Sequence, residues 1–392
     1  MENNNDNKVL NVPPLRFPEF SGEWESVILK DIADFQKERI SSELLDERTY
    51  ISTENILQNF EGVQSANSIP ANTNVIEYKE SDILLSNIRP YLKKVWFADR
   101  TGGCSADVFV LRSRSCEPKY LYYVIASDKF INYIMSGAKG VKMPRGDKKQ
   151  MECFTFSIPA IAEQKKISRL LHLLDERITT QNKIIEKLQS LIKGLIDDII
   201  TLKCGQLVAF ETLYSKAGEG GTPTTSNTEF YDNGSIPFIK IDDLSNKYLS
   251  ANKDYITELG LKKSSAWLIP THSIIYSNGA TIGAISINKY PVCTKQGILG
   301  IVPNTNIDVE FLYYFMQSSY FQKEVERVVT EGTMKTAYLK DINHIKCPIP
   351  DLDRQKEISH LLSVLSLKED VERQLLQKYQ IQKQYLLRKM FI

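Results

Sequence analysis

Two long segments of the chain carry apolar residues at the spacing of a helix that packs against another helix. From Ala162 to Lys203 apolar positions recur at alternating steps of four and three, with one polar interruption at Gln181. This pattern predicts a helix about 60 Å long with a heptad seam. The segment after Pro350 starts with the same spacing of apolar residues. In its middle, however, Glu369 and Glu372 occupy positions of the seam. The positions expected to pair the two helices are Ile167, Leu171, Leu174, Ile178, Ile185, Leu188, Ile192, Leu195, Ile358, Leu362, Leu365, Leu376 and Tyr379.

The rest of the chain mixes short strand patterns with short helical patterns. Runs such as SDILLSNI, DVFVLRS and HSIIYSN are rich in β-branched and other apolar residues and are bounded by turn residues, as strands are. KYLYYVIASDKFINYIMS has helical spacing instead. Each of the two globular halves is therefore predicted to be α+β.

The chain is an internal duplication with an offset of 191 residues. IPAIAEQKKISRLLHLL at 158–174 reappears as IPDLDRQKEISHLLSVL at 349–365, with nine identities. In the same register, YLYYVIASDKF (120–130) matches FLYYFMQSSYF (311–321) and DILLSN (82–87) matches SIIYSN (273–278). A repeat of this length is a whole domain with a helix behind it, not a solenoid unit.

The duplication predicts five segments. They are a disordered polar tail at 1–13, a globular domain at 14–157, a long helix at 158–204, a second domain at 205–348 and a second helix at 349–392. Both helices leave their domains through the same Ile-Pro exit, so we expect an antiparallel coiled coil with pseudo-twofold symmetry.

Composition and motifs narrow the function. The 392 residues include 49 Lys+Arg and 48 Asp+Glu, and 42% are hydrophobic, as in an ordinary globular protein and unlike a polybasic nucleic-acid coat. Counted by segment, the small excess of Lys and Arg over Asp and Glu lies on the two long helices. No Walker A sequence, HExxH, CxxC pair or Asn/Asp-Pro-Pro-aromatic tetrapeptide of amino-methyltransferases is present. The sequence thus indicates a chain without its own cofactor or metal chemistry.

Targeting signals are also missing from the sequence. No apolar run approaches the roughly 18 residues that cross a bilayer, and MENNNDNK lacks the features of a signal peptide. Six scattered cysteines fit free thiols in a reducing compartment. We expect a cytoplasmic protein without membrane contact.

Several of these motifs together resemble one family. PPLRFPEFSGEW at 13–24, two domains that each end in Ile-Pro-(x)4-Gln-Lys-(x)-Ile, and a long helix after each are similar to the specificity subunit of type I restriction–modification systems. LSNIRPYLKK (85–94) and GGTP (220–223) resemble segments of its target-recognition domains.

The resemblance implies a non-catalytic DNA-recognition subunit. Each globular half would read one half of a split DNA target, and the paired helices would set the gap between the halves. The helices would also dock two modification (methyltransferase) subunits, and restriction (motor/nuclease) subunits would join that core. S-adenosylmethionine, ATP and Mg²⁺ are then expected on the partners. The alternatives are a nuclease that acts alone and a coiled-coil adaptor that does not read DNA.

DNA contact requires basic groups for phosphates and planar polar groups for base edges. The densest basic run is the loop KGVKMPRGDKK at 139–149, with EGTMKTAYLK (331–340) as its counterpart, and a second basic run is SNIRPYLKK. Solvated loops without a role would look the same. The predicted DNA-contacting residues are Ser86, Asn87, Arg89, Lys93, Lys94, Arg112, Lys142, Arg145, Lys148, Lys149, Thr222, Ser277, Asn278, Lys335 and Lys340.

Two other features are read as structural. Asp242 and Asp243 could suggest a metal site, but the first copy has Glu54 and Asn55 there and no third carboxylate follows in nuclease spacing. We therefore expect turn or capping residues. The paired tyrosines at 122–123 and 313–314 match between the copies, which favours core packing over base stacking.

Overall fold

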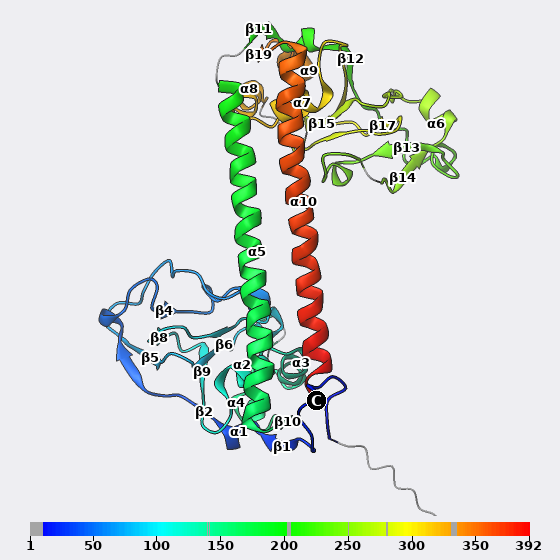
Figure 1. Ribbon diagram of the computed structural model, residues 1–392. Helices are drawn as coiled ribbons and strands as arrows, with labels where there is room; N and C mark the ends of the chain where they lie inside the picture. The colour runs from blue at the N-terminus through cyan, green and yellow to red at the C-terminus, as the bar shows by residue number, and fades with distance from the viewer. Residues whose placement is uncertain are drawn as a thin grey trace, which may run out of the picture. The chain divides into compact units, whose positions relative to one another are not determined.

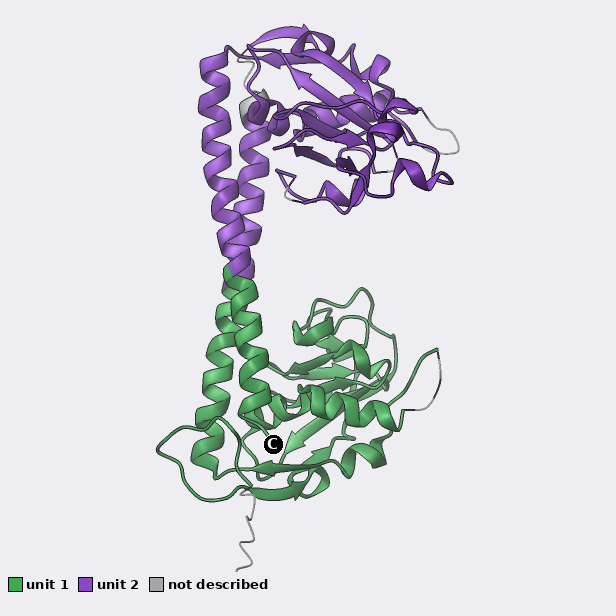
Figure 2. Cartoon of the chain, turned by 90° about the vertical axis from the view of Figure 1, so that its right-hand side faces the viewer, with its two compact units in different colours: residues 1–180, 375–392 green, residues 181–374 purple. Residues whose placement is uncertain are grey.

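The computed structural model describes residues 11–392 except 139, 141, 202–204, 250, 280 and 331–334. The chain forms two compact units, residues 1–180 with 375–392 (unit 1) and residues 181–374 (unit 2) (Figure 2). Each unit contains one α+β domain together with parts of two long helices (Figure 1). Those helices are α5 (Ile161–Thr201) and α10 (Leu352–Lys389), and each runs from one unit into the other.

The domain of unit 1 is built on two four-stranded sheets. The first has the order β2 (Ala33–Phe35), β9 (Val108–Ser113), β6 (Ile83–Ser86), β7 (Val95–Phe97). The second has the order β3 (Arg39–Ser41), β5 (Asn74–Tyr78), β8 (Gly102–Cys104), β4 (Tyr50–Ile51). The helices are α1 (Leu29–Ile32), α2 (Pro118–Ile125), α3 (Asp128–Ser136) and α4 (Lys148–Glu152), with short 3₁₀ turns η1 (Ser42–Leu44), η2 (Gln58–Phe60) and η3 (Pro90–Leu92).

The domain of unit 2 has a related plan. One sheet has the order β12 (Tyr214–Glu219), β18 (Ile298–Pro303), β15 (Ile274–Ser277), β16 (Ile285–Ile287), and the other β14 (Asp254–Ile256), β13 (Ile236–Ile239), β17 (Cys293–Thr294). The helices are α6 (Glu258–Lys262), α7 (Val309–Phe315), α8 (Ser319–Val328) and α9 (Leu339–Ile342), with η4 (Phe210–Leu213), η5 (Thr228–Phe230) and η6 (Ile241–Asp243).

The central strand of each domain is apolar because both of its faces are covered. In β6, Ile83 and Leu85 pack into the core that contains the helices, whereas Leu84 packs into the core shared with the second sheet. In β15, Ile274 and Ile275 divide between two cores in the same way. A run of consecutive apolar residues is what a strand buried on both faces requires.

A short antiparallel pair closes each domain beside its helix. In unit 1, β1 (Glu25–Ile28) pairs with β10 (Thr155–Ile158), so the start of the domain meets its end. In unit 2, β11 (Gln206–Ala209) pairs with β19 (Lys346–Ile349). Asn11 is bonded to the first of these strand pairs. Its side-chain amide donates to the carbonyl of Trp24 at 2.6 Å and to Ser157 Oγ at 3.1 Å. The predicted tail at 1–13 is therefore wrong at residues 11–13, and residues 1–10 lie outside the described part.

The repeated glutamine of the Ile-Pro-(x)4-Gln motif joins each helix to its domain. Gln164 Oε1 accepts from the N–H of Glu117 at 2.9 Å, and its Nε2 donates to the carbonyl of Pro159 at 2.8 Å. Gln355 makes the equivalent bonds, to the N–H of Asp308 at 2.9 Å and to the carbonyl of Pro350 at 2.9 Å. Both side chains are buried. The motif thus links the Ile-Pro exit, the first turns of the long helix and the start of α2 or α7.

The predicted seam faces inward along both helices. Ile167, Leu171, Leu174, Ile185, Ile358 and Leu362 are buried, and the remaining predicted pairing residues are half-buried. The ends of the seam also pack on the domains. Ile167 and Leu171 belong to the core of the first domain, and Ile358 and Leu362 to the core of the second. Each helix emerges directly from its domain, so its first turns complete that core.

Polar residues contact each other across the helix pair within each unit, where α5 and α10 run antiparallel (Figure 1). In unit 1, Lys383 pairs with Asp175 at 2.6 Å, and the hydroxyl of Tyr123 donates to the same carboxylate at 2.7 Å. In unit 2, Gln181 Nε2 donates to the carbonyl of Glu372 at 3.1 Å and to its carboxylate. Gln181 and Glu372 are separated by 191 residues, so they are the same position in the two repeats. Equivalent residues of an antiparallel pair meet where a twofold relation between the two helices has its axis.

Removal of the Gln355 side chain by Gln355→Ala should lower the free energy of unfolding by about 1–3 kcal/mol, because it leaves the N–H of Asp308 without its buried acceptor. Urea denaturation of the full chain measures the difference. The matched control is Lys356→Ala, an exposed neighbour on the same turn. Equal stability of the two variants would contradict the proposed link between domain and helix.

Candidate nucleic-acid interface

Three loops of the first domain meet at one asparagine after the central strand. The N–H of Asn87 donates to the carbonyl of Asp107 at 2.8 Å, and the carbonyl of Asn87 accepts from the N–H of Gly146 at 3.1 Å. The N–H of Arg89 donates to Pro144 at 2.8 Å. These bonds join loops 86–94, 105–107 and 142–147, which we call the three-loop surface of the first domain.

The second domain repeats this junction. The N–H of Asn278 donates to Gly297 at 3.1 Å, and its carbonyl accepts from the N–H of Ala337 at 2.9 Å. Its side-chain Nδ2 also donates to the carbonyl of Ala337 at 3.1 Å. Asn278 and Ala337 match Asn87 and Gly146 at the 191-residue offset. The loops 277–279, 295–297 and 335–338 form the three-loop surface of the second domain.

The junction is retained at an energetic cost. The Oδ1 atoms of both asparagines are buried and have no hydrogen-bond partner among the described residues. A buried unsatisfied acceptor costs about 1–3 kcal/mol. The main-chain bonds that each asparagine makes to two other loops fix its backbone.

Three predicted DNA contacts are corrected by their burial. Ser86, Ser277 and Asn278 are each at most 1% exposed. Ser86 Oγ donates to the carbonyl of Ile88 at 3.0 Å, inside the loop. The side chains of Ser86 and Asn278 bond to main-chain carbonyls within the three-loop surfaces, and none of the three buried side chains presents a polar group to a ligand.

Arg112 is the fourth correction. Its Nε donates to one carboxylate oxygen of Asp82 and its NH2 to the other, both at 2.8 Å. Asp82 is only 1% exposed. The hydrogen bonds that Arg112 donates to Asp82 raise the pKa of Arg112 above its ordinary value. Arg112 neutralises a buried carboxylate, so it is committed to the fold. At the 191-residue offset the second copy has Ser273 and Pro303, and the ion pair belongs to the first domain alone.

Four other predicted cations of the first domain are already partnered within it. Lys93 pairs with Asp128 at 2.6 Å and Arg145 with Asp107 at 2.9 Å. Lys148 lies 3.6 Å from Glu152, and its ammonium is over the ring of Phe35. Lys94 Nζ donates to the carbonyl of Thr53 at 2.6 Å, and burial lowers its pKa. Exposed pairs of this kind contribute little to stability and can exchange partners.

Three of the predicted DNA-contacting cations of the first domain are exposed and have no ion pair among the described residues. They are Arg89, Lys142 and Lys149. Arg89 and Lys93 have φ angles of 51° and 55°, so left-handed backbone flanks the short turn η3. Non-glycine residues in this region are strained, and such strain concentrates at functional sites.

The second domain presents a less basic surface. Lys335 and Lys340 are exposed, and Lys340 lies over the ring of Tyr338. Thr222 Oγ1 accepts from the N–H of Gln296 at 3.3 Å, which ties the GGTP segment to the loop at 295–297. The predicted segment at 331–334 lies outside the described residues.

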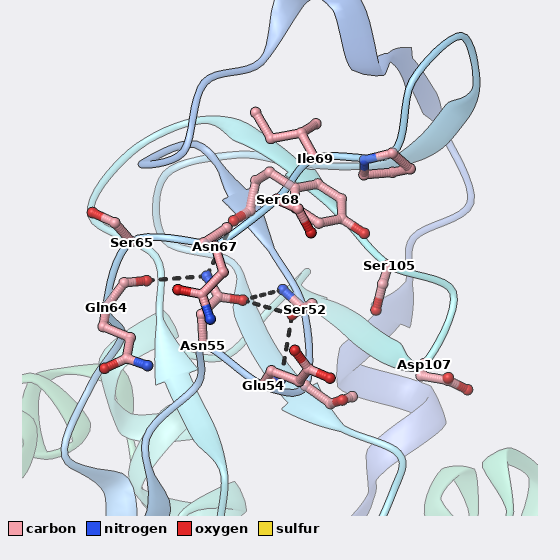
Figure 3. Close-up of a pocket in the computed structure, with 14 residues that line it drawn as sticks. Ser52, Glu54, Asn55, Gln64, Ser65, Asn67, Ser68, Ile69, Ser105 and Asp107 are labelled. Atoms are coloured by element: carbon pink, nitrogen blue, oxygen red, sulfur yellow. Dashed lines mark hydrogen bonds between the residues drawn. The ribbon is translucent and has the colours of Figure 1, made fainter.

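A polar hollow that was not predicted from the sequence lies beside the first three-loop surface (Figure 3). The hollow has a volume of about 390 Å³ and is lined mainly by short polar side chains from three loops, at 50–55, 64–70 and 105–107. No motif or charge run marks these residues, so they carry no local signal in the sequence. At its base, Asn55 Oδ1 accepts from Ser52 Oγ at 2.9 Å and its Nδ2 donates to the carbonyls of Tyr50 and Gln64 at 3.1 Å.

The expectation of turn and capping residues is confirmed for Asn55 and Asp243. Asp243 Oδ2 accepts from the N–H of Lys240 at 2.8 Å, as Asn55 Oδ1 accepts from the N–H of Ser52. Within the described part of the chain, no group of three or more His, Cys, Asp or Glu side chains could hold a metal ion. No helix there is long and apolar enough to cross a membrane.

Two copies of one α+β domain, each joined to a long helix and each with its own three-loop surface, define a two-domain recognition scaffold. The chain belongs to the family of the type I restriction modification DNA specificity domain, which matches residues 21–190 and 214–379. It is therefore a DNA sequence-recognition subunit of a type I restriction–modification system, and a non-catalytic one.

Similar proteins cover nearly the whole chain. The specificity subunit of the type I restriction enzyme MjaVIII from Methanocaldococcus jannaschii is 25% identical over 94% of this chain and 91% of its own. That of HindI from Haemophilus influenzae is 21% identical over 79% of this chain and 86% of its own. The crystal structure of the type I S subunit from M. genitalium has the same fold, with a TM-score of 0.63 and 17% identity over 97% of this chain and 99% of that chain.

Arg112→Ala should destabilise the protein by about 2–3 kcal/mol, because it leaves the buried carboxylate of Asp82 unpaired and the arginine itself is partly exposed. Thermal unfolding of the full chain measures this effect. Arg114→Ala is the control, since Arg114 pairs with an equally exposed Asp34. The recognised DNA sequence should stay unchanged in both variants, and altered recognition in Arg112→Ala would restore its predicted role in DNA contact.

Proposed function

We propose that the three-loop surface of each domain is the part that contacts DNA. The observation that carries this proposal is the repeated asparagine junction, which has the same main-chain bonds in both domains while the side chains around it differ. A protein that reads two different half-sites with one duplicated domain needs this combination of a shared framework and different loops.

The exposed cations on these surfaces and on the short helices α4 and α9 that directly follow them would bind phosphates. In the first domain these are Arg89, Lys142 and Lys149, and in the second Lys335 and Lys340. Phosphate contacts position a protein on DNA without specifying sequence, so base recognition falls to polar side chains between them. Because these cations are few and the chain has a net charge of only +1, the affinity of the isolated chain should be low and should rise with the charge that its partners bring.

The paired helices would set the gap between the half-sites and dock two modification subunits. Part of α10 supports this role with an exposed apolar stripe of Leu361, Val364, Leu367 and Val371, which recur every three or four residues. Apolar side chains gathered on one exposed helix face indicate a surface for another protein. Restriction subunits would join through the modification subunits.

All chemistry in this proposal belongs to the partners. The modification subunits would bring S-adenosylmethionine, and the restriction subunits ATP and Mg²⁺. This chain would contribute binding, orientation and the choice of target. The complex would act in the cytoplasm, where the host DNA is found and where free thiols such as Cys104 and Cys293 stay reduced.

Charge reversal by Lys142→Glu with Lys149→Glu should weaken DNA binding of the complex with the modification subunits by roughly tenfold or more. The slope of log affinity against log salt concentration should become shallower by about 2, since two phosphate contacts are lost. Fluorescence anisotropy over a salt series measures both quantities.

The matched control reverses two exposed lysines of the first domain outside the three loops, Lys30→Glu with Lys37→Glu. If the two double variants had the same affinity and salt slope, the three-loop surface of the first domain would not be a DNA contact.

A further inference from the structure

We infer that the polar hollow of the first domain reads one base, by accepting hydrogen bonds from the exocyclic amino group of a cytosine or an adenine in the major groove. This inference rests on the proposed DNA contact of the three-loop surface and goes beyond it, because it assigns a chemical preference to particular side chains.

The hollow is continuous with the three-loop surface. Asp107 lines the hollow and also accepts, through its main-chain carbonyl, from the N–H of Asn87 at the loop junction. Lys94 from the loop 86–94 donates to the carbonyl of Thr53, another lining residue. DNA held by the exposed cations of the three loops would therefore meet the mouth of the hollow.

The wall of the hollow is rigid. Asn55 is buried, and its side-chain amide is bonded to two carbonyls on one side and to Ser52 on the other. The N–H of Gln64 donates to the carbonyl of Asn55 at 2.9 Å, and the N–H of Ser105 to that of Ile51 at 2.9 Å. A site that is already ordered loses little conformational entropy on binding, which favours both affinity and discrimination.

The polar groups of the lining favour a donor and disfavour a phosphate. Glu54 and Asp107 are the charged side chains of the hollow, and an ionised carboxylate can only accept hydrogen bonds. They repel phosphate oxygens. In the major groove, the amino groups of cytosine and adenine are the donors, whereas guanine and thymine present acceptors there. Serine hydroxyls and the amides of Gln64 and Asn67 add groups that can accept or donate around them (Figure 3).

Other side chains limit how the carboxylates can act. Arg145 NH1 pairs with Asp107 Oδ1 at 2.9 Å, which orients that carboxylate and leaves its second oxygen to accept. Among the described residues the carboxylate of Glu54 has no hydrogen bond, and Glu54 is exposed. Glu54 is therefore the acceptor that a base can reach with the least rearrangement.

The second domain does not have the same acceptor pair. The residue that accepts from the asparagine junction there is Gly297, where the first domain has Asp107. At the turn of Glu54 the second domain has Asp242, directly before the capping residue Asp243. One carboxylate is kept and the other is absent. Side chains that determine sequence specificity should differ in this way between two domains with different half-sites.

The test uses Glu54→Gln in the complex with the modification subunits, with methylation measured on a library of randomised DNA targets. Glutamine keeps the size of the side chain but gains donors, so it should accept guanine or thymine edges. One position of one half-site, at which the unchanged complex requires cytosine or adenine, should lose that preference by about tenfold or more. All other positions should be unchanged.

Asp107→Asn is the second variant and should relax the same position or its neighbour. Glu43→Gln, an exposed carboxylate of the same domain outside the hollow, is the control and should leave the target unchanged. An unchanged target in both Glu54→Gln and Asp107→Asn, or a uniform loss of methylation without a change in base preference, would overturn the inference. If the lysine charge reversal still weakened DNA binding, the proposed function would stand without it.

Discussion

The attachment of each long helix to its own domain is the constraint on which the rest of the structure depends. A buried glutamine at the start of each long helix bonds both to the Ile-Pro exit and to the N-cap residue of the domain helix α2 or α7. The first apolar residues of the same helix complete the domain core. Each domain is thereby fixed to the beginning of a helix and is not attached through a flexible linker.

The duplication shows which parts of the domain are framework and which can vary. The glutamine bonds, the serine N-caps of α3 and α8 and the main-chain bonds of the asparagine junction occur in both copies. The buried Asp82–Arg112 pair and the carboxylate of Asp107 in the hollow occur in one copy only. Recognition can therefore diverge between the domains without loss of the shared scaffold.

Much of this architecture could be predicted from the sequence, because a duplication and a heptad repeat are regular patterns of residues. The 191-residue offset and the heptad seam indicated two α+β domains and two long helices, and the comparison of Glu54–Asn55 with Asp242–Asp243 indicated turn or capping residues, as Asn55 and Asp243 are. Gln181 and Glu372 looked like separate polar defects in two seams. They are one contact, which becomes evident only when the helices are paired.

The candidate site was less predictable because its contacts join residues far apart in the chain. Arg112 appeared as a cation at the end of a strand, and only the fold brings it to Asp82, 30 residues away. Asn278 directly follows a strand as a loop residue would, yet it is buried and bonds to Ala337, 59 residues away. The hollow is formed by three separate loops of ordinary polar residues, so no local pattern could reveal it.

The central claim is that the two domains read DNA independently on a shared helical frame. Exchange of residues 14–157 for the corresponding domain of a relative with a different target, followed by sequencing of the methylated bases in the host genome, tests this claim most directly. The account predicts that one half of the recognised sequence changes, while the other half and the number of bases between them stay the same. A change of both halves together, or of the gap, would contradict it.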